Sequence, residues 1–212
     1  MFPVEIRTDR LRLRRATREE VPSLELYEHG REGAASIEDV TRYVTWGPYR
    51  SPKEADEFLR RIEDRWEAGE SAVYAVYPRD GEDGAGAFAG TAGLHFEWGR
   101  DTAAFGIWLR KPFRGRGYVS ERARAFFEVA FDELDVSLCA AEAIPADERA
   151  VRAIADYVEA AGGSRDGEFR HRVERDGDPE STVRFSVTQA EWRDAVDERT
   201  ATLRWEDGDG DE

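Results

Sequence analysis

The sequence predicts one mixed domain of the α/β (α+β) class, in which a mostly antiparallel sheet contains one parallel crossover and carries helices on both faces. Between residues 71 and 109, short apolar segments alternate with turn residues, which is typical of an antiparallel meander. A long helical segment then precedes the next strand, which indicates a parallel pair. At 212 residues the chain is long enough to fill one core, and we find no repeat or linker that would divide it.

The first third of the chain is predicted to hold one strand and two helices. Residues 9–17 alternate leucine with arginine, which indicates a half-buried strand, and residues 17–29 are predicted to form a helix. A second helix is predicted to begin at Ser51, which has capping-box spacing to Glu54 and is followed by a proline. The apolar positions of this helix recur on one face, at Ala55, Phe58, Leu59, Ile62 and Trp66.

The meander is predicted to consist of strands over residues 71–78, 86–98 and 102–109. Asp-Gly pairs in residues 79–86 mark the turn between the first two strands. After residue 117 the apolar spacing changes from that of a strand to that of a helix. The apolar positions of that helix are Ala123, Phe126, Phe127, Ala130, Phe131 and Leu134.

The last third is predicted to hold a strand, a helix, a hairpin and a final helix. The strand spans residues 136–144, and Asp147 caps the following helix, which places Val151, Ile154, Ala155 and Val158 toward the core. Residues 167–188 are predicted to form the hairpin, and Thr188 has capping-box spacing ahead of the last helix. We therefore expect a single domain over residues 1–203 and a disordered acidic tail over residues 204–212.

The composition excludes several classes of function. The net charge is −15, which disfavours a general nucleic-acid partner because an acidic surface repels phosphate. No apolar run approaches the length of a membrane span, and the first residues lack the pattern of a signal peptide, so we expect a cytoplasmic protein without a membrane partner. Cys139 is the single cysteine and is expected to be a buried thiol, and no metal site is predicted. The acidic, lysine-poor composition resembles that of proteins from salt-loving organisms.

The segment KPFRGRGYVSERA, which begins at Lys111, has the character of an anion site. Cations crowd the start of a predicted helix, where the macrodipole disfavours positive charge unless an anion is present. Gly115 and Gly117 allow the backbone to approach a ligand closely, and the free N–H groups of the helix start point into the same space. A diphosphate satisfies all of these features together.

Three other interpretations of this segment remain open alternatives. The first is an ordinary strand-to-helix turn whose arginines are solvated. The second is a dinucleotide-binding loop of an oxidoreductase, although Ser120 stands where the third glycine belongs and the preceding strands form a meander. The third is an arginine patch for RNA, which the surrounding acidity disfavours. A phosphate-binding P-loop is excluded, because no Gly-Lys-Ser/Thr follows.

These residues resemble a known family. RGRGYVSE, preceded by FGIWLRKPF, is similar to motif A of the GCN5-related N-acetyltransferases. TDRLRLRRAT resembles the opening strand of the subgroup that acetylates the N-termini of ribosomal proteins, and GTAGLHFEW with AAFGIWL resembles its central hairpin. The similar segments run from about residue 8 to residue 188, and the resemblance implies the acetyltransferase fold, with acetyl-CoA as acyl donor.

The resemblance also implies which residues bind acetyl-CoA. The strand from Trp108 to Lys111 would pair with the pantetheine arm, and the amide of Leu109 or Arg110 would stabilise the oxyanion. Asp147 would cap its helix and accept a bond from the pantetheine, and Arg152 would reach a phosphate. The diphosphate would lie on the loop of Arg114, Gly115, Arg116, Gly117, Tyr118 and Val119, the last standing where the family has glycine or alanine.

The catalytic groups are predicted from the same resemblance. Attack on a thioester requires a neutral amine and hence a general base, for which Glu142 is our candidate. Alanine stands at position 150, where many relatives have a serine able to donate a proton, and Tyr157 is the candidate for that role although it lies about one helical turn beyond the usual position. Further base candidates are Glu97, Asp101 and His95.

The expected activity is therefore transfer of an acetyl group to a primary amine of a peptide, protein N-terminus or small molecule. An alternative is a sensor or interaction module that binds acetyl-CoA without turnover, because the acid is missing at residue 150. The acceptor and the oligomeric state are not predicted, although the loop over residues 30–50, with Trp46 and Tyr49, is a candidate acceptor site.

Overall fold

The structure is a computed structural model, and it describes residues 1–35, 37–44, 46–175 and 177–206. The described strands are β1 (Glu5–Arg7), β2 (Leu11–Arg15), β3 (Ser71–Pro78), β4 (Gly90–Glu97), β5 (Thr102–Leu109), β6 (Leu138–Ala143), β7 (Ser164–Arg175), β8 (Asp178–Thr188) and β9 (Thr202–Arg204). The described helices are α1 (Ser23–Gly30), α2 (Ile37–Thr41), α3 (Pro52–Glu67), α4 (Tyr118–Phe127), α5 (Glu148–Ala160) and α6 (Gln189–Ala195). Shorter turns are the 3-10 helices η1 (Trp98–Arg100) and η2 (Lys111–Phe113), and α4 continues into a π-helical segment, η3 (Glu128–Glu133).

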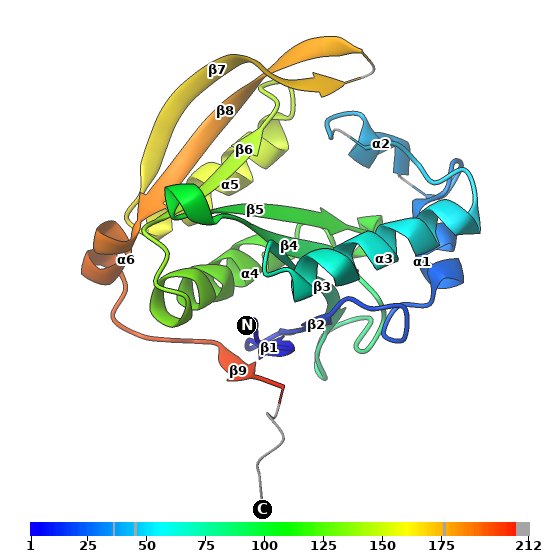
Figure 1. Ribbon diagram of the computed structural model, residues 1–212, viewed down its shortest axis with the longest axis horizontal. Helices are drawn as coiled ribbons and strands as arrows, with labels where there is room; N and C mark the ends of the chain where they lie inside the picture. Colours follow the sequence, from blue (N-terminus) through cyan, green and yellow to red (C-terminus); the bar gives the residue numbers. More distant parts are fainter. Residues whose placement is uncertain (36, 45, 176, 207–212) are drawn as a thin grey trace, which may run out of the picture.

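The described strands form one sheet in the order β7-β8-β6-β5-β4-β3-β2-β1-β9 (Figure 1). The neighbours β5 and β6 are parallel, and the other neighbouring pairs are antiparallel. The crossover between β5 and β6 runs through α4, as the long helical segment predicted. In Figure 1 the β7–β8 hairpin curls away from the sheet at its upper edge. The predicted mixed fold, with one parallel pair, is confirmed.

Two apolar layers cover the two faces of the sheet. The larger cluster joins alternate residues of the strands to α4 and α5, with Phe126 and Tyr157 among its members. The smaller cluster joins the opposite face of β3 to α1 and α3, with Leu26 and Leu59 among its members. Alternate residues of a strand point to opposite faces, so in β5 Ile107 and Leu109 pack in the larger cluster and Trp108 in the smaller one.

Several predicted boundaries were wrong. The first helix begins at Ser23 and not at residue 17, because Pro22 stands at its N-cap and residues before it form turns. The second strand of the meander begins at Gly90 and not at residue 86. A side chain at Gly90 would place its Cβ 2.0 Å from the carbonyl oxygen of Trp108, so the two strands come together at a position that only glycine allows.

The capping predictions had different outcomes. The capping box of Thr188 and Glu191 is complete, with bonds in both directions. Ser51 accepts a bond from the amide of Glu54, but the Glu54 carboxylate instead accepts from the backbone and side chain of Arg50. The Ser51 box is therefore only half formed.

Three short elements, β1, β9 and α2, were not predicted from the sequence. Strand β9 includes Arg204, the first residue of the predicted tail, which pairs with Glu5 of β1. Residues 207–212 of that tail lie outside the described residues. Among the described residues, no helix combines the length and apolar character needed to cross a membrane.

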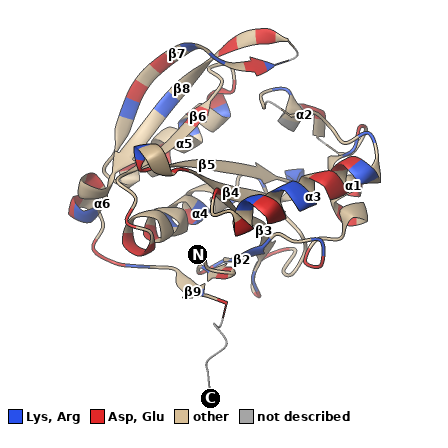
Figure 2. Cartoon of the chain, in the orientation of Figure 1, with Lys and Arg blue, Asp and Glu red and all other residues tan. Residues whose placement is uncertain are grey.

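Charged residues of both signs alternate along the outer elements, as Figure 2 shows for α3 and the β7–β8 hairpin. At the sheet edge, the carboxylate of Glu5 is buried and lies within 2.9 Å of Arg12 Nε and 2.5 Å of Arg7 Nε. Arg14 and Arg204 contact the same carboxylate at 3.6 and 3.8 Å. Burial by itself would raise the pKa of Glu5, but the hydrogen bonds from Arg12 and Arg7 outweigh it and lower the pKa.

Replacement of Glu5 by glutamine is expected to lower the free energy of unfolding by about 2 kcal/mol at pH 7, because four arginines lose their shared counter-charge. Since the pKa of Glu5 is lowered by folding, this stabilisation is present at neutral pH and is lost as the pH falls through the folded-state pKa. The measurement is urea unfolding of Glu5→Gln beside Glu67→Gln, whose side chain is 71% exposed. Equal stability of the two variants would contradict the role of Glu5.

Candidate active site

The loop between β5 and α4 exposes a row of backbone donors. Gly115 and Gly117 have φ of 73° and 81°, a region that glycine enters without strain. A Cβ at Gly115 would meet nothing within 4 Å. Among the described residues, no backbone acceptor is found for the amide N–H groups of residues 115–119, as expected at a helix start. The loop can therefore accept an anion from its open side.

Interactions from behind hold the loop in this shape. Arg10 donates from Nη1 to the carbonyl oxygen of Arg116 at 2.8 Å and from Nε to Glu121 at 2.7 Å. Glu121 also accepts from the backbone amide of Arg10 at 2.8 Å. Tyr118 is buried and donates to Glu82 at 2.6 Å. Arg10 and Glu121 were not predicted from the sequence, because a loop residue and a helix residue more than 100 positions apart give no local pattern.

The arginine side chains of the loop are already engaged. Arg116 donates to the carbonyl oxygen of Asp83 at 2.8 Å and to its carboxylate at 2.9 Å. Arg114 donates from Nε to the carbonyl oxygen of Leu109 at 2.7 Å. Lys111 is exposed at the surface. Asp83, in the loop before β4, thus balances part of the positive charge that predicted an anion site, and the backbone amides of residues 115–119 stay open to a ligand.

Strands β5 and β6 separate beside this loop. They pair over three positions, from Thr102 with Leu138 to Ala104 with Ala140, and β5 then continues to Leu109 without pairing to β6. At the wide end lies a polar cavity of about 310 Å³, lined by Arg42, Tyr43, Arg114, Ala146, Asp147, Glu148 and Arg149. The cavity therefore lies between Arg114, at the start of the glycine loop, and the start of α5.

The start of α5 has the predicted cap. The Asp147 carboxylate accepts from the amide of Ala150 at 3.0 Å, and Asp147 also lines the cavity. Arg152 is exposed one turn later. Val119 is partly buried at the edge of the larger apolar cluster. The two cavity residues from beyond α2, Arg42 and Tyr43, gave no signal in the sequence because their loop has no periodic pattern.

The two predicted oxyanion donors, the amides of Leu109 and Arg110, differ in whether they are already hydrogen-bonded. The amide of Arg110 donates to the carbonyl oxygen of Ala89 at 2.8 Å, and its Nη1 donates to the carbonyl oxygen of Phe88 at 2.5 Å. This hydrogen bond continues the β4–β5 pairing beyond the two strands, so the Arg110 amide is not open to a ligand. Leu109 is buried directly before it, at the end of β5.

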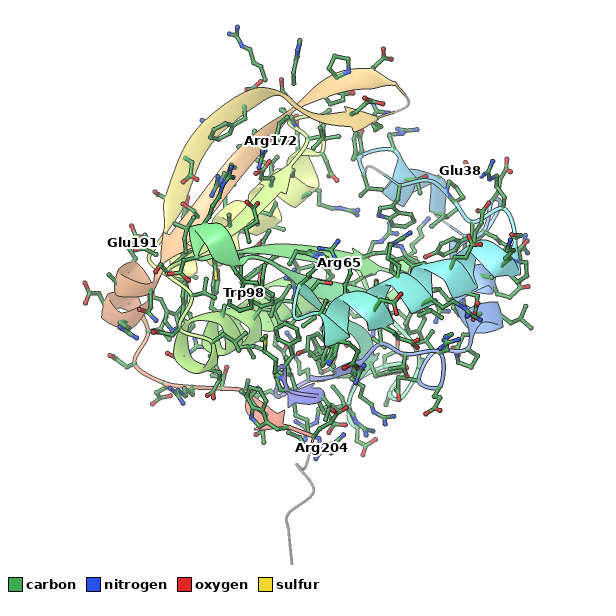
Figure 3. All side chains as sticks on the ribbon, viewed as in Figure 1. Glu38, Arg65, Trp98, Arg172, Glu191 and Arg204 are labelled. Atoms are coloured by element: carbon green, nitrogen blue, oxygen red, sulfur yellow. The ribbon has the colours of Figure 1, made fainter. Side chains whose placement is uncertain are left out.

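Glu142 lies on the sheet face opposite α5. Its neighbours Cys139 and Ala141 belong to the cluster beneath the sheet, so strand alternation turns Glu142 to the other face. Its carboxylate accepts from Thr182 at 2.6 Å and contacts Arg172 at 3.3 Å. Arg172 extends from the β7–β8 hairpin, as Figure 3 shows. The carboxylate is 23% exposed, so it is positioned by two partners and still reachable.

Tyr157 lies on the α5 side of the same sheet, in the larger apolar cluster. Its ring packs against Phe127, and burial raises its pKa to about 12, the effect being partly offset by Arg122. Arg122 is itself buried in α4, and Phe105 of β5 and Tyr157 both lie against its guanidinium. Arg122 was not predicted from the sequence, because it is a charged residue within the apolar face of its helix.

The other base candidates, Glu97, Asp101 and His95, differ in their contacts. Asp101 accepts from the Ser137 hydroxyl and joins the β4–β5 turn to β6, while Glu97 pairs with Arg100 at 3.2 Å. His95 projects from the same face as Glu142, and its Nε2 lies 3.6 Å from where a Cβ of Gly106 would be. Partial desolvation, and then the charge of Arg65, lower the pKa of His95.

Trp108 packs as the sequence predicted for a core residue. Its ring contacts Phe88 and Trp46 at centroid distances of 6.2 Å. Tyr49 packs on Phe58 of α3, and burial raises its pKa. Within the described part of the chain, no group of three or more histidine, cysteine or acidic residues is placed to hold a metal ion.

Comparison with known proteins places these features in a family. The family model described as "Acetyltransferase (GNAT) domain" matches residues 10–157. No curated protein matches the chain.

Solved structures share the fold at low identity. The ribosomal L7/L12 alpha-N-protein acetyltransferase RimL, in complex with coenzyme A, is 18% identical, with a TM-score of 0.70 over 88% of this chain and 97% of that chain. A GCN5-related N-acetyltransferase from Brucella melitensis is 19% identical, with a TM-score of 0.70 over 89% and 80%. The microcin C7 self-immunity acetyltransferase MccE, in complex with acetyl-CoA and AMP, is 13% identical, with a TM-score of 0.71 over 85% and 93%.

Proposed function

Because this chain belongs to the acetyltransferase (GNAT) family, we propose that it transfers the acetyl group of acetyl-CoA to the primary amine of a peptide N-terminus, a protein N-terminus or a small molecule. The amine attacks the thioester directly. The observation that carries the proposal is the row of open amides at residues 115–119, beside the wide end of the separation between β5 and β6. The family assignment replaces the oxidoreductase alternative, since a GNAT domain uses acetyl-CoA.

The binding residues fit the two ends of acetyl-CoA. The amides of residues 115–119 hold the diphosphate, and Gly115 leaves room for it because nothing lies within 4 Å of its missing side chain. The unpaired edge of β5 from Phe105 to Leu109 offers backbone groups to the amides of the pantetheine arm, in the manner of an added strand. Asp147 lines the cavity beside the loop, and Arg152, exposed on α5, is the proposed partner of a phosphate.

The two faces of the sheet divide the chemistry. Acetyl-CoA supplies an activated acyl group, and the acceptor must reach it as a neutral amine although free alkyl amines are mostly protonated at pH 7. Glu142 removes that proton from the face opposite α5, directly or through water. The amide of Leu109 stabilises the oxyanion. Tyr157 belongs to the other face, where the CoA sulfur leaves.

Substitution of Tyr157 by phenylalanine is expected to lower kcat about tenfold with little change in KM for acetyl-CoA, because the hydroxyl acts only when the thiolate forms. Its pKa of about 12 keeps the hydroxyl protonated throughout the neutral range, so it is able to donate a proton at every working pH. Steady-state kinetics check this, with Tyr27→Phe, in the smaller cluster on the opposite face of the sheet, as the control. An unchanged kcat would assign Tyr157 to packing.

We propose that the acceptor is cationic and that the reaction takes place in the cytoplasm. A chain with net charge −15 attracts protonated amines and repels nucleic acid. The loop that follows α1 contributes Arg42 and Tyr43 to the cavity at the wide end. These residues are the candidates for discriminating among acceptors.

The test is release of free CoA thiol from acetyl-CoA in the presence of peptides and small amines, together with the mass gain of the acceptor. We expect turnover with at least one amine class and none without an amine. Tight binding of acetyl-CoA with no turnover on any amine would instead favour a non-catalytic sensor. The observation that favours this second function is Ala150, which cannot donate a proton as the serine of many relatives can.

A further inference from the structure

Arg122 is a buried cation of α4. Its side chain is 1% exposed, and within the described chain neither Nε nor Nη1 has a hydrogen-bond partner. No ion pair to it is found among the described residues either. The rings of Phe126, Phe105 and Tyr157 lie 5.0, 5.7 and 6.0 Å from its guanidinium carbon. An unpaired buried charge is costly, and aromatic faces compensate only in part.

The position of Arg122 connects it to the strand separation. Phe105 directly follows Ala104, the last β5 residue paired to β6, and its ring is only partly buried. Arg122 and Tyr157 approach this point from α4 and α5. From Ala104 to Leu109, at the end where the glycine loop begins, β5 extends roughly 17 Å, given about 3.4 Å per residue. An extended cofactor whose phosphates lie on the loop therefore brings its far end toward Arg122.

We infer that Arg122 is the residue that stabilises the thiolate of the departing CoA, an inference that rests on the proposed function. As the amine nitrogen bonds to the acetyl carbon, the carbon–sulfur bond breaks and its electron pair remains on sulfur. The amine proton goes to the base on the opposite face. A fixed positive charge in a site of low dielectric lowers the energy of that thiolate, and it needs no reorganisation to do so.

The surrounding groups keep this charge available. Burial lowers the pKa of Arg122 to about 10, so the guanidinium stays protonated at neutral pH. The titratable groups nearest to it and to Tyr157 are Tyr157 itself, from α5, and Cys139, from β6. Burial raises the pKa of both, so neither competes as an anion where a free thiol ionises, at a pKa of about 8.5.

The experiment compares the affinities of CoA and desulfo-CoA, which lacks the sulfur, by calorimetry between pH 6 and pH 9. For the parent protein we expect the preference for CoA to rise about tenfold across this range, because the bound thiol has the lower pKa. Arg122→Met should abolish the rise and leave the affinity for desulfo-CoA unchanged. Arg122→Lys, which keeps the charge, should retain part of the rise.

Two results would overturn the inference. The first is a flat preference in the parent protein, a measurement that requires no variant to fold. The second is an equal loss of affinity for both ligands in Arg122→Met, which would mean that Arg122 merely holds α4 and α5 in place. A parent that transfers acetyl groups with a flat preference refutes this role alone, whereas a rising preference without turnover on any amine refutes the proposed function alone.

Discussion

Gly115→Asp is expected to weaken acetyl-CoA binding by at least about 100-fold, or about 3 kcal/mol. The new carboxylate would lie in the open space beside Gly115, next to the amides of residues 115–119, and would occupy or repel the position of the diphosphate. Aspartate tolerates the φ of 73° that this position requires. The measurement is calorimetric titration with acetyl-CoA.

Gly115→Asn is the matched control, because asparagine has the same shape and the same tolerance of positive φ but no charge. We expect it to weaken binding by less than about tenfold. The folded state of Gly115→Asp should be at least as stable as that of Gly115→Asn, since an anion at a helix start is favourable. Equal affinity of the two variants for acetyl-CoA would show that charge at this loop is irrelevant and that no anion is bound there.

Glu142→Gln is expected to lower kcat by about 100-fold, the usual contribution of a general base, while KM for acetyl-CoA changes little. The amide keeps the position of Glu142 beside Thr182 and loses the capacity to take a proton. The measurement is steady-state kinetics with the best acceptor from the amine panel.

Two controls distinguish a base from an anchor of the hairpin. Arg172→Met breaks the ion pair to Glu142 but leaves the carboxylate, so it should retain most of the activity. His95→Gln tests the other candidate on that face and should also retain activity. If Arg172→Met lost as much activity as Glu142→Gln, the carboxylate would be an anchor; if His95→Gln were the inactive variant, the base would be His95.

The parts of the fold that could be predicted are those with a local period. Strands β3 and β5 match the predicted ranges residue for residue, because alternation and flanking turns bound them on both sides. Strands β1 and β9 have three residues each, which is too short for any period to emerge. Strand β1 lies between β2 and β9 in the sheet, and the partner of β9 is about 200 residues away in the chain. No sequence pattern within either segment carries that information.

The candidate site shows the same limit. The glycines at residues 115 and 117 allow the loop to be predicted, because their backbone conformation excludes most other residues. The partner of Arg116, which is Asp83, and the buried position of Arg122 depend on how distant segments pack. Charge counted along the sequence therefore overstated the number of cations open to an anion at the loop, and gave no indication of the cation beneath the strand separation.

The most direct test of this account is a crystal structure of the protein with acetyl-CoA. We expect the diphosphate on the amides of residues 115–119, the pantetheine arm along β5 from Leu109 toward Phe105, and the sulfur at the point where β5 and β6 part, above Arg122. A diphosphate bound elsewhere, or an arm that does not enter the separation between β5 and β6, would contradict it.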